Sequence, residues 1–208
     1  MRTPLEPRLV LLDRDDTVSL DRPGYIRSPE DLELYPEAAG ALARLARLGF
    51  CLAVVTNQSA VGRGLVSPEE LRRIHDRLTS ELARAGAPLA GVYHCPHRPE
   101  DGCGCRKPQP GLLRQAAADL GLTLSGSHLV GDAWSDVALG QAAGCRTVLV
   151  LTGRGGQALA RVNGDPAVHV AEDLAAAAEW IADCERRSAN GEPGTDAGRD
   201  DRGVVSKS

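Results

Sequence analysis

Short apolar runs alternate with amphipathic stretches along most of this chain, and this alternation restricts the fold more than any other feature of the sequence. The first run, residues 8–12, is apolar after Arg8 and stops at Asp13. Runs without polar alternation are typical of strands buried on both faces of a sheet. Similar runs recur at residues 51–55, 91–94, 128–130 and 147–151. The sequence therefore predicts an α/β fold with a mostly parallel sheet.

Apolar residues recur at helical spacing in the stretches between and after these runs. The second stretch has a well-marked start, because Ser67 and Glu70 form a capping-box pattern around Pro68. Strands that alternate with helices form a doubly wound sheet, in which ligands bind beyond the carboxyl ends of the strands. Helices are expected over residues 36–48, 68–85, 112–120, 135–143 and 173–184.

The length of 208 residues favours a single domain. Periodicity is lost at about Arg186, where Gly, Ser, Asp and Arg predominate, so we expect a domain over residues 1–185 and a disordered tail over residues 186–208. The apolar run at 9–12 is too short for a signal peptide, and no run approaches the ~20 residues of a membrane span. We therefore expect a cytoplasmic protein.

Charge and aromatic content exclude two kinds of partner. The chain has 24 basic and 28 acidic residues, a net charge of −4, and only 3% aromatic residues. Binding to nucleic acid or an anionic membrane needs a basic surface, and stacking on bases needs aromatic side chains. We expect no nucleic-acid or membrane partner, and a monomer that acts on a small molecule.

Two carboxylates, Asp13 and Asp15, follow the first buried run directly. One interpretation is an ordinary strand-end turn, since Asp and Thr are common there. The other is catalytic, with Asp13 as nucleophile, Asp15 as general acid and base, and a divalent cation that offsets their repulsion. Three further polar residues each have a structural interpretation when taken singly: Thr56 as a strand-end cap, Lys107 as a surface charge and Asp132 as a helix cap. Their shared position near strand ends favours the catalytic interpretation for Thr56, Lys107 and Asp132.

A compact group of metal-binding side chains lies in the loop after the third run. Three cysteines and one histidine fall within residues 95–105, with proline and glycine between them. The set suits a closed tetrahedral zinc site, so we expect a structural zinc that orders this loop. Stray thiols beside a surface histidine are the alternative. The expected ligands are Cys95, His97, Cys103 and Cys105.

Four motifs together resemble those of the haloacid dehalogenase superfamily of phosphohydrolases. They are Asp13-x-Asp15-x-Thr17, Thr56-Asn57-Gln58-Ser59, Cys105-Arg106-Lys107-Pro108 and Gly131-Asp132-x-x-x-Asp136. The resemblance is closer to the zinc-containing branch of D-glycero-D-manno-heptose 1,7-bisphosphate 7-phosphatases and histidinol-phosphatases, and runs from about Leu9 to Asp183. It implies a Rossmann-like doubly wound sheet. The stretches after the first two runs are too short for a large cap domain.

The resemblance also implies a Mg²⁺-dependent phosphatase with an aspartyl-phosphate intermediate. Asp13 would attack phosphorus, and Asp15 would protonate the leaving alkoxide and then activate water. Thr56 and Lys107 would hold the phosphoryl oxygens as charge develops. The implied Mg²⁺ ligands are the Asp13 carboxylate, the Asp15 backbone carbonyl and Asp132, with Asp136 in support.

The implied reaction is hydrolysis of the 7-phosphate of D-glycero-D-manno-heptose 1,7-bisphosphate, with histidinol phosphate or another small phosphate monoester as the alternative substrate. Arg63 is expected either to meet the distal phosphate or to cap the next helix. Arg106 is the best-placed residue for a second phosphate, because guanidinium binds phosphate bidentately. The implied substrate borders are Asp21, Arg22, Gly24 and Tyr25, then Asn57, Gln58 and Ser59, then Arg106 with Lys107.

Two positions depart from the family pattern. Asp16 stands where the family has glycine, and the turn can still form because Asp tolerates left-handed backbone angles better than most residues. The extra carboxylate also keeps open a different class of protein, a zinc-stabilised binding protein with impaired catalysis. Residues 21–25 carry one residue more than the Asp-x-Gly-Tyr stretch of the family, which alters the loop that would contact the sugar.

Overall fold

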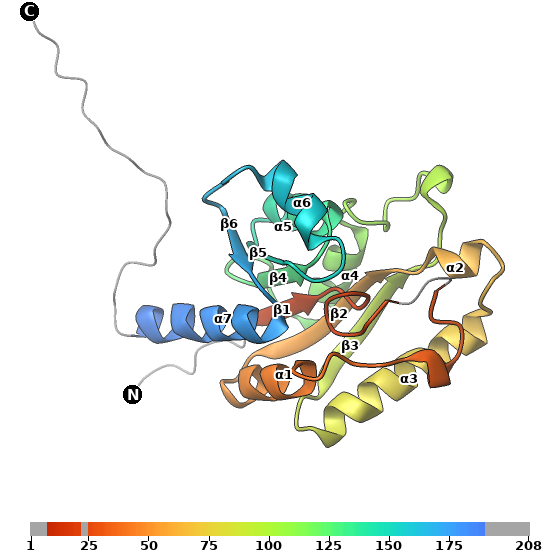
Figure 1. The fold of residues 1–208 in the computed structure, drawn as a ribbon, viewed down its shortest axis with the longest axis horizontal. Coiled ribbons are helices and arrows are strands. Elements are labelled where there is room, and N and C mark those ends of the chain that lie inside the picture. The colour runs from red at the N-terminus through yellow and green to blue at the C-terminus, as the bar shows by residue number, and fades with distance from the viewer. Residues whose placement is uncertain (1–7, 22–24, 190–208) are drawn as a thin grey trace, which may run out of the picture.

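A six-stranded sheet organises the protein in the computed structural model, which describes residues 8–21 and 25–189. All pairings are parallel, and the strand order is β3-β2-β1-β4-β5-β6 (Figure 1). The chain starts in the middle of the sheet at β1, adds β2 and β3 on one side, and then adds β4, β5 and β6 on the other. The strands are β1 (Leu9–Leu12), β2 (Cys51–Asn57), β3 (Leu89–Cys95), β4 (His128–Gly131), β5 (Arg146–Val150) and β6 (Val168–Ala171). The helices are α1 (Ala38–Arg47), α2 (Ser59–Gly62), α3 (Pro68–Arg84), α4 (Gly111–Leu120), α5 (Trp134–Ala142), α6 (Gly155–Val162) and α7 (Leu174–Ala189), with 3₁₀ turns η1 (Pro29–Asp31) and η2 (Pro99–Asp101).

The predicted doubly wound α/β fold is confirmed, and the five expected strands and five expected helices are present as β1 to β5 and as α1, α3, α4, α5 and α7. The apolar patterns do not predict α2, α6 or β6. The strand β6 reads Val-His-Val-Ala and two of its four residues are only half-buried, so its sequence lacks the continuous apolar run of the central strands.

The central strand β1 shows why the sheet needs helices on both sides. All four of its residues have no exposed surface. Val10 and Leu12 pack into a core with residues of α1, α3 and α7, whereas Leu9 and Leu11 pack on the other face with residues of α4. Since neighbouring strand residues point to opposite faces, a run without polar residues requires a core on each side.

The helices form two layers around the sheet, with α1, α3 and α7 on one side and α4, α5 and α6 on the other (Figure 1). The capping pattern predicted for α3 is observed, because the Ser67 side chain accepts a hydrogen bond from the Glu70 amide at 3.0 Å. Among the described residues, the segments after β1 and β2 hold only η1 and α2 before the next long helix, so no large cap domain is present there.

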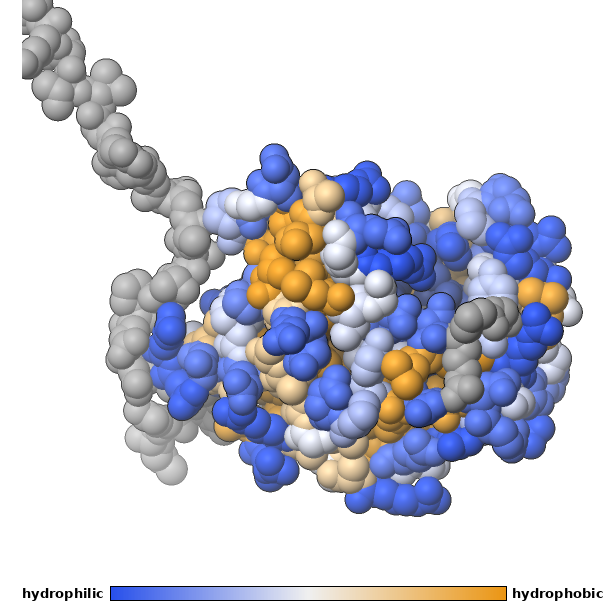
Figure 2. Space-filling view, viewed as in Figure 1, coloured by the Kyte–Doolittle hydropathy of each residue, from blue (hydrophilic) through white to orange (hydrophobic). Residues whose placement is uncertain are grey.

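The carboxyl-terminal helix α7 continues to Ala189, beyond the domain boundary expected at residue 185. The rest of the expected tail lies outside the described residues. No helix in the described ranges combines the length and apolar character that crossing a bilayer would need. Hydrophilic side chains predominate on the face seen in Figure 2, and one of its apolar areas lies over the region of α6. Leu159 of α6 and Leu151, which follows β5, are among the exposed large apolar residues.

Candidate active site

The strand register brings three expected catalytic residues to one edge of the sheet. Leu12 is level with Val130 of β4, and β2 runs beside β1 on the other side. Asp13, Thr56 and Asp132 therefore lie at the carboxyl ends of three neighbouring strands. The Asp13 amide donates to the Val130 carbonyl at 2.9 Å, which continues the ladder by one residue.

Lys107 reaches this edge from the loop before α4, and its side chain is buried. Its Nζ lies 2.8 Å from Asp13 Oδ1 and 2.6 Å from Asp136 Oδ1, and it donates to the Val55 carbonyl at 3.0 Å. Asn57 holds the lysine backbone, since its Oδ1 accepts from the Lys107 amide at 3.0 Å and its Nδ2 donates to the Lys107 carbonyl at 3.3 Å. The surface-charge interpretation of Lys107 is therefore wrong.

Three carboxylates gather beside this lysine. Oxygen atoms of Asp13, Asp132 and Asp136 all lie within 4.8 Å of one another. Asp132 is fully buried, and its Oδ2 accepts from the Arg154 amide at 2.8 Å, while its Oδ1 meets no hydrogen-bond donor among the described residues. A buried carboxylate oxygen without a partner is costly, and carboxylate oxygens are the ligands that Mg²⁺ prefers. The residues present therefore fit a divalent cation.

Asp136 combines a structural with an electrostatic role. Its Oδ2 accepts from the Ala133 amide at 3.1 Å and so caps the start of α5, while Oδ1 pairs with Lys107. A side chain at Gly131 would clash with the Asp136 carboxylate, so the glycine at the end of β4 is required for this packing. Asp132 is not the cap of this helix.

Burial and charge together set the protonation of these groups. Burial raises the pKa of Asp13 to about 7, opposed by Lys107 and reinforced by the neighbouring acids. Burial also raises the pKa of Asp132, to about 6. Burial by itself lowers the pKa of Lys107, but Asp13 and Asp136 more than reverse this and raise it above its usual value. A bound cation would add positive charge and favour the ionised carboxylates.

Asp15 lies in a buried network that the sequence patterns do not predict. Arg14 donates from Nε and Nη2 to its two oxygens, at 2.7 and 3.0 Å. Gln58 Nε2 donates to Asp15 Oδ2 at 2.8 Å and to Thr56 Oγ1 at 2.9 Å. Gln58, expected on the substrate border, is thus buried against two candidate catalytic residues. The sequence feature that could have identified Arg14 is its charge next to a strand buried on both faces. A buried arginine is almost always paired with other side chains, so partners are expected for it.

The four expected zinc ligands converge in the loop after β3. The sulfur atoms of Cys95, Cys103 and Cys105 are 3.3 to 3.5 Å apart, and His97 Nδ1 lies 3.2 Å from Cys105 Sγ and 3.6 Å from Cys95 Sγ. Tetrahedral zinc with Zn–S bonds of about 2.3 Å separates its sulfur ligands by roughly 3.8 Å. The cysteines are free thiols, so the cluster fits a metal ion.

The loop that carries this Cys/His cluster, residues 95–105, is connected to the catalytic edge through β2. Asn57 is level with Cys95 of β3, and the Gln58 amide donates to the Cys95 carbonyl at 2.7 Å. Since Asn57 also holds the backbone of Lys107, one short segment links the cluster to the buried lysine. The loop and the backbone of Lys107 are therefore held by two adjacent residues, Asn57 and Gln58.

The expected first substrate border is only partly described. Asp21 is exposed and Tyr25 is 40% exposed, so both meet solvent, whereas Arg22 and Gly24 lie outside the described residues.

The other expected borders are described in full. Ser59 is buried at the start of α2. Arg63 is exposed at the end of α2 and does not cap α3, whose cap is Ser67. Arg106 is half-buried and donates to the His97 carbonyl at 3.3 Å.

Asp16 adopts a left-handed backbone angle, with φ at 58°. Its Oδ1 accepts from the Asp21 amide at 3.1 Å and from the Tyr35 hydroxyl at 3.5 Å. The expectation that the turn forms with Asp in place of glycine is confirmed. The extra carboxylate also helps to hold the segment that follows the turn.

A family model described as HAD-hydrolase-like matches residues 104–177. With the doubly wound sheet and the carboxylates and lysine at the ends of its central strands, this match defines a haloacid dehalogenase-like hydrolase. The D-glycero-beta-D-manno-heptose-1,7-bisphosphate 7-phosphatases of Bordetella bronchiseptica and Pseudomonas aeruginosa are each 39% identical to this chain, over 84% and 83% of it and 97% of their own lengths. The chain belongs to this family of heptose bisphosphate 7-phosphatases, and it is a phosphoric monoester hydrolase.

Solved structures agree with this placement. The crystal structure of the D,D-heptose 1,7-bisphosphate phosphatase from B. bronchiseptica, complexed with magnesium and phosphate, matches with a TM-score of 0.79 and 38% identity, over 85% of this chain and 98% of that one. The phosphatase from Burkholderia thailandensis matches with a TM-score of 0.66 and 28% identity, over 84% and 98% of the two chains.

Proposed function

We propose that this enzyme removes the 7-phosphate of D-glycero-D-manno-heptose 1,7-bisphosphate through an aspartyl-phosphate on Asp13. The observation that carries the proposal is the placement of Asp13 beside Lys107, Asp132 and Asp136, in a chain 39% identical to a heptose bisphosphate 7-phosphatase over 97% of that enzyme's length. A binding protein with impaired catalysis would not need this complete set.

Asp13 is suited to nucleophilic attack by the way it is held. Lys107 Nζ and the Arg14 amide both engage Oδ1, at 2.8 and 2.7 Å. We therefore assign Oδ2 to the attack on phosphorus. Bound by Asp13, the Asp15 backbone carbonyl and Asp132, with Asp136 in support, Mg²⁺ would supply the positive charge that lets an anionic carboxylate approach an anionic phosphate.

The remaining candidate groups fit the two proton transfers and the transition-state charge. As the P–O bond to the sugar breaks, Asp15 gives a proton to the leaving oxygen, and it then takes a proton from the water that attacks the aspartyl-phosphate. The Thr56 hydroxyl and the Lys107 ammonium hold phosphoryl oxygens, because preorganised donors stabilise charge that develops there.

Zinc in the Cys95, His97, Cys103 and Cys105 cluster is the second proposed metal. Four protein ligands leave no position for water, so the ion is structural. Burial raises the pKa of the Cys95 thiol to about 12, so zinc binding must displace a proton there. A site that depends on reduced thiols suits the cytoplasm, where we place this enzyme as a monomer.

The sugar and its second phosphate are assigned to the loops around the catalytic edge. Arg106 is the proposed ligand of the distal phosphate, since it is half-buried next to Lys107 and guanidinium binds phosphate bidentately. Arg63, exposed at the end of α2, is the second candidate. The other proposed substrate contacts are Asp21, Arg22, Gly24, Tyr25, Asn57, Gln58 and Ser59, of which Arg22 and Gly24 lie outside the described residues.

Steady-state kinetics on three substrates test the proposal. With saturating Mg²⁺, kcat/KM should be highest for a heptose 1,7-bisphosphate, compared as both C1 anomers, and lower for histidinol phosphate. A higher kcat/KM for histidinol phosphate would overturn the proposed substrate but not the proposed phosphatase mechanism.

Asp13→Asn is the control for the chemistry. It should abolish turnover of every substrate without unfolding the protein, because Lys107 keeps its pairing with Asp136. Retained turnover in this variant would remove Asp13 as the nucleophile.

A further inference from the structure

Arg14 is a buried arginine between two candidate catalytic aspartates. It is 1% exposed, although arginine is seldom buried unless its charge is paired. Its Nε and Nη2 donate to the two oxygens of Asp15, and the same Nη2 donates to Gln58 Oε1 at 2.9 Å. The remaining nitrogen, Nη1, lies 3.2 Å from His75 Nε2. Each nitrogen of the guanidinium thus has a partner inside the protein.

The contact with Arg14 determines the state of His75. A guanidinium donates hydrogen bonds and accepts none, so His75 Nε2 must accept. The ring is therefore neutral, with its proton on Nδ1. Burial, assisted by the charge of Arg14 and by His94, lowers the pKa of His75 to about 3, in agreement with this assignment. His75, a residue of α3, thus holds the Nη1 end of the Arg14 guanidinium.

Gln58 fixes the other side with an equally defined orientation. Its Oε1 faces a group that only donates, and its Nε2 faces the Asp15 carboxylate, which only accepts when ionised. The amide cannot be reversed without losing both bonds. Asp15 thereby receives three hydrogen bonds from two side chains that are themselves held by α3 and by the end of β2.

One acceptor position of Asp15 is left for chemistry. Two hydrogen bonds end on Oδ2 and one on Oδ1, whereas a carboxylate accepts about four. The side chain is 20% exposed, so solvent or a leaving-group oxygen can reach it. The network thus restricts the rotation of Asp15 without enclosing it.

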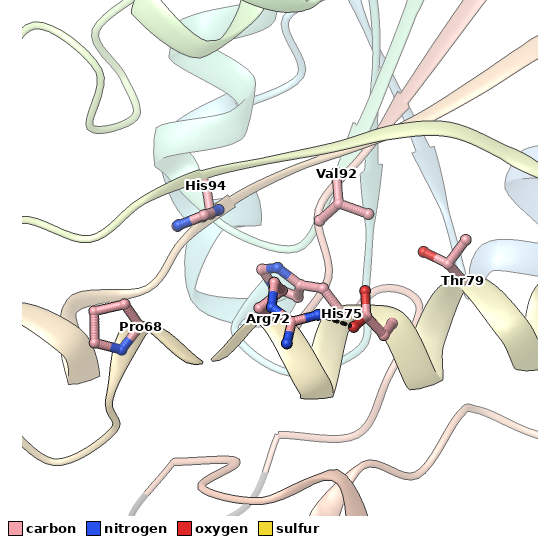
Figure 3. A pocket seen from close by; sticks show the side chains of 7 residues that line it. Pro68, Arg72, His75, Thr79, Val92 and His94 are labelled. Atoms are coloured by element: carbon pink, nitrogen blue, oxygen red, sulfur yellow. Dashed lines mark hydrogen bonds and ion pairs between the residues drawn. The ribbon is translucent and has the colours of Figure 1, made fainter. Parts of the chain in front are cut away.

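A pocket of about 310 Å³ between α3 and β3 is lined by both His75 and His94 (Figure 3). The two rings are in contact, with 5.3 Å between their centroids. His94 is therefore a matched control, because it lies beside His75 and makes no hydrogen bond to Arg14 in the described structure.

We propose that Arg14, clamped between His75 and Gln58, is a positioning residue that sets the orientation of Asp15 for both of its proton transfers. The inference rests on the proposed role of Asp15 as general acid and base. The bidentate contact is the decisive observation. Two hydrogen bonds from the planar guanidinium of Arg14 to both oxygens of Asp15 fix the plane of the carboxylate, whereas the single charge of a lysine would leave that plane free to rotate.

Leaving-group dependence separates positioning from a loss of fold. An alkyl phosphate needs a proton on its leaving oxygen, whereas the p-nitrophenolate of p-nitrophenyl phosphate leaves without one. His75→Leu removes the acceptor of Arg14, and we expect kcat for an alkyl phosphate such as glycerol 3-phosphate to fall ~10- to 100-fold, as misplaced catalytic groups do. With p-nitrophenyl phosphate, rapid mixing should show a stoichiometric burst at the wild-type rate and then slow turnover, because water activation also needs Asp15.

Conservative variants keep the test decisive where His75→Leu folds poorly. His75→Gln offers an acceptor at a similar reach and should restore most of the alkyl phosphatase activity. Arg14→Lys keeps the charge without the fork and should show the same burst pattern as His75→Leu. His94→Gln should match the wild type with both substrates.

The variant Asp15→Asn distinguishes the role of Asp15 as general acid and base from the positioning role of Arg14. If this variant shows the burst pattern and the His75 and Arg14 variants do not, the positioning role is wrong and the role of Asp15 stands. If Asp15→Asn lowers turnover of both substrates equally and without a burst, the role of Asp15 falls, and the positioning inference falls with it. An equal loss on both substrates in His75→Leu, together with a lower Tm and no rescue by glutamine, would assign the network to structure alone.

Discussion

At the scale of single residues, Asp16 combines a backbone suited to glycine with a side chain that has its own contacts. Its φ of 58° lies in the left-handed region, where glycine has no steric cost. Gly153 packs directly against it, and a side chain there would clash with both Asp16 and Asp132. The Asp16 carboxylate is thus an added negative charge next to the proposed cation site.

Replacing Asp16 with glycine tests the effect of that charge. We expect Asp16→Gly to raise kcat/KM or leave it unchanged at saturating Mg²⁺, because the backbone relaxes and an anion that repels the phosphate is removed. A Mg²⁺ titration of steady-state rates checks this. A large loss of kcat/KM at every Mg²⁺ concentration would instead give the bonds to Asp21 and Tyr35 a positive role in catalysis.

His128 in β4 carries a pH dependence of stability. It has no exposed surface, and neither ring nitrogen has a partner among the described residues; its ring contacts are edge-on to Phe50 and Trp180. Burial lowers its pKa to about 3, while the unfolded chain titrates near 6.5. Below pH 6.5 the unfolded state therefore binds a proton that the folded state excludes, and stability falls as pH falls.

The variant His128→Phe should remove this loss. One such histidine costs about 2 kcal/mol of unfolding free energy between pH 7 and pH 5. Urea unfolding at both pH values should show a smaller decrease in the variant and a higher free energy at pH 7, because two unpaired polar atoms are gone. His169→Phe is the comparison, since this ring also stacks on Trp180 but is only half-buried. Burial lowers the pKa of His169 too, and its replacement should reduce the pH dependence less than His128→Phe. An unchanged pH dependence in His128→Phe would contradict the assignment.

The candidate site was predictable where chemistry depends on residue type and position along the chain. Asp13 and Asp132 follow strands directly and Thr56 is the penultimate residue of β2, and a parallel sheet brings such positions together. The partners of Asp15 were not predictable in this way, because His75 comes from the second turn of α3 and reaches Arg14 only once that helix has packed. Likewise, Gln58 looks like a loop residue until β2 and β3 pair.

At the scale of elements, the loop at residues 95–105 is the segment that the proposed zinc is expected to order. Residues 95–105 contain only the three-residue turn η2 as regular structure, and apart from Cys95 their side chains are half-buried or exposed. Such a loop lacks an apolar core of its own. It is nevertheless joined to α2, since the Gly62 amide donates to the Pro96 carbonyl at 2.9 Å.

Cys103→Ser should therefore lower zinc content and stability together. The binding free energy of a structural metal is also folding free energy, and a loss of about 2–3 kcal/mol corresponds to a fall of roughly 5–10 °C in Tm for a chain of this size. Metal analysis and thermal melts of the same preparation measure both. Cys184→Ser, a half-buried cysteine on α7, is the matched control. Full zinc content after replacement of all four ligands would refute the site.

The elements that the sequence did not predict were missed for different physical reasons. The central strands are buried on both faces, so their apolar runs are continuous, whereas β6 lies at the edge of the sheet and exposes part of its surface. The helix α6 is amphipathic but has only eight residues, begins with two glycines, and packs against the small core that includes Val137, Leu149 and Val168. Glycine is a poor helix former, so a short segment that begins with two of them gives a weak helix signal in the sequence.

At the scale of the whole molecule, α7 ties the end of the described chain to its beginning. Arg8, just before β1, pairs with Glu185 of α7 at 2.6 Å between Nη1 and Oε2. The Ser188 hydroxyl donates to the Cys184 carbonyl at 2.9 Å within the last turns. The helix α7 thus continues past residue 185, the domain boundary expected from composition, and we propose that the domain includes the last turn of this helix.

Two truncations test this boundary. A chain that ends at Ala189 should keep the Tm and kcat/KM of the full protein, since it retains both the ion pair and the last turn of α7. A chain that ends at Asp183 loses Glu185, and its Tm should fall by a few degrees, because a partly buried pair contributes about 1 kcal/mol. Its kcat should stay the same at temperatures below the transition, since every candidate catalytic residue precedes α6. Equal Tm values for the two truncations would show that residues 184–189 add no stability and would contradict their inclusion in the domain, and a lower kcat in the shorter chain would show that α7 also supports the catalytic edge.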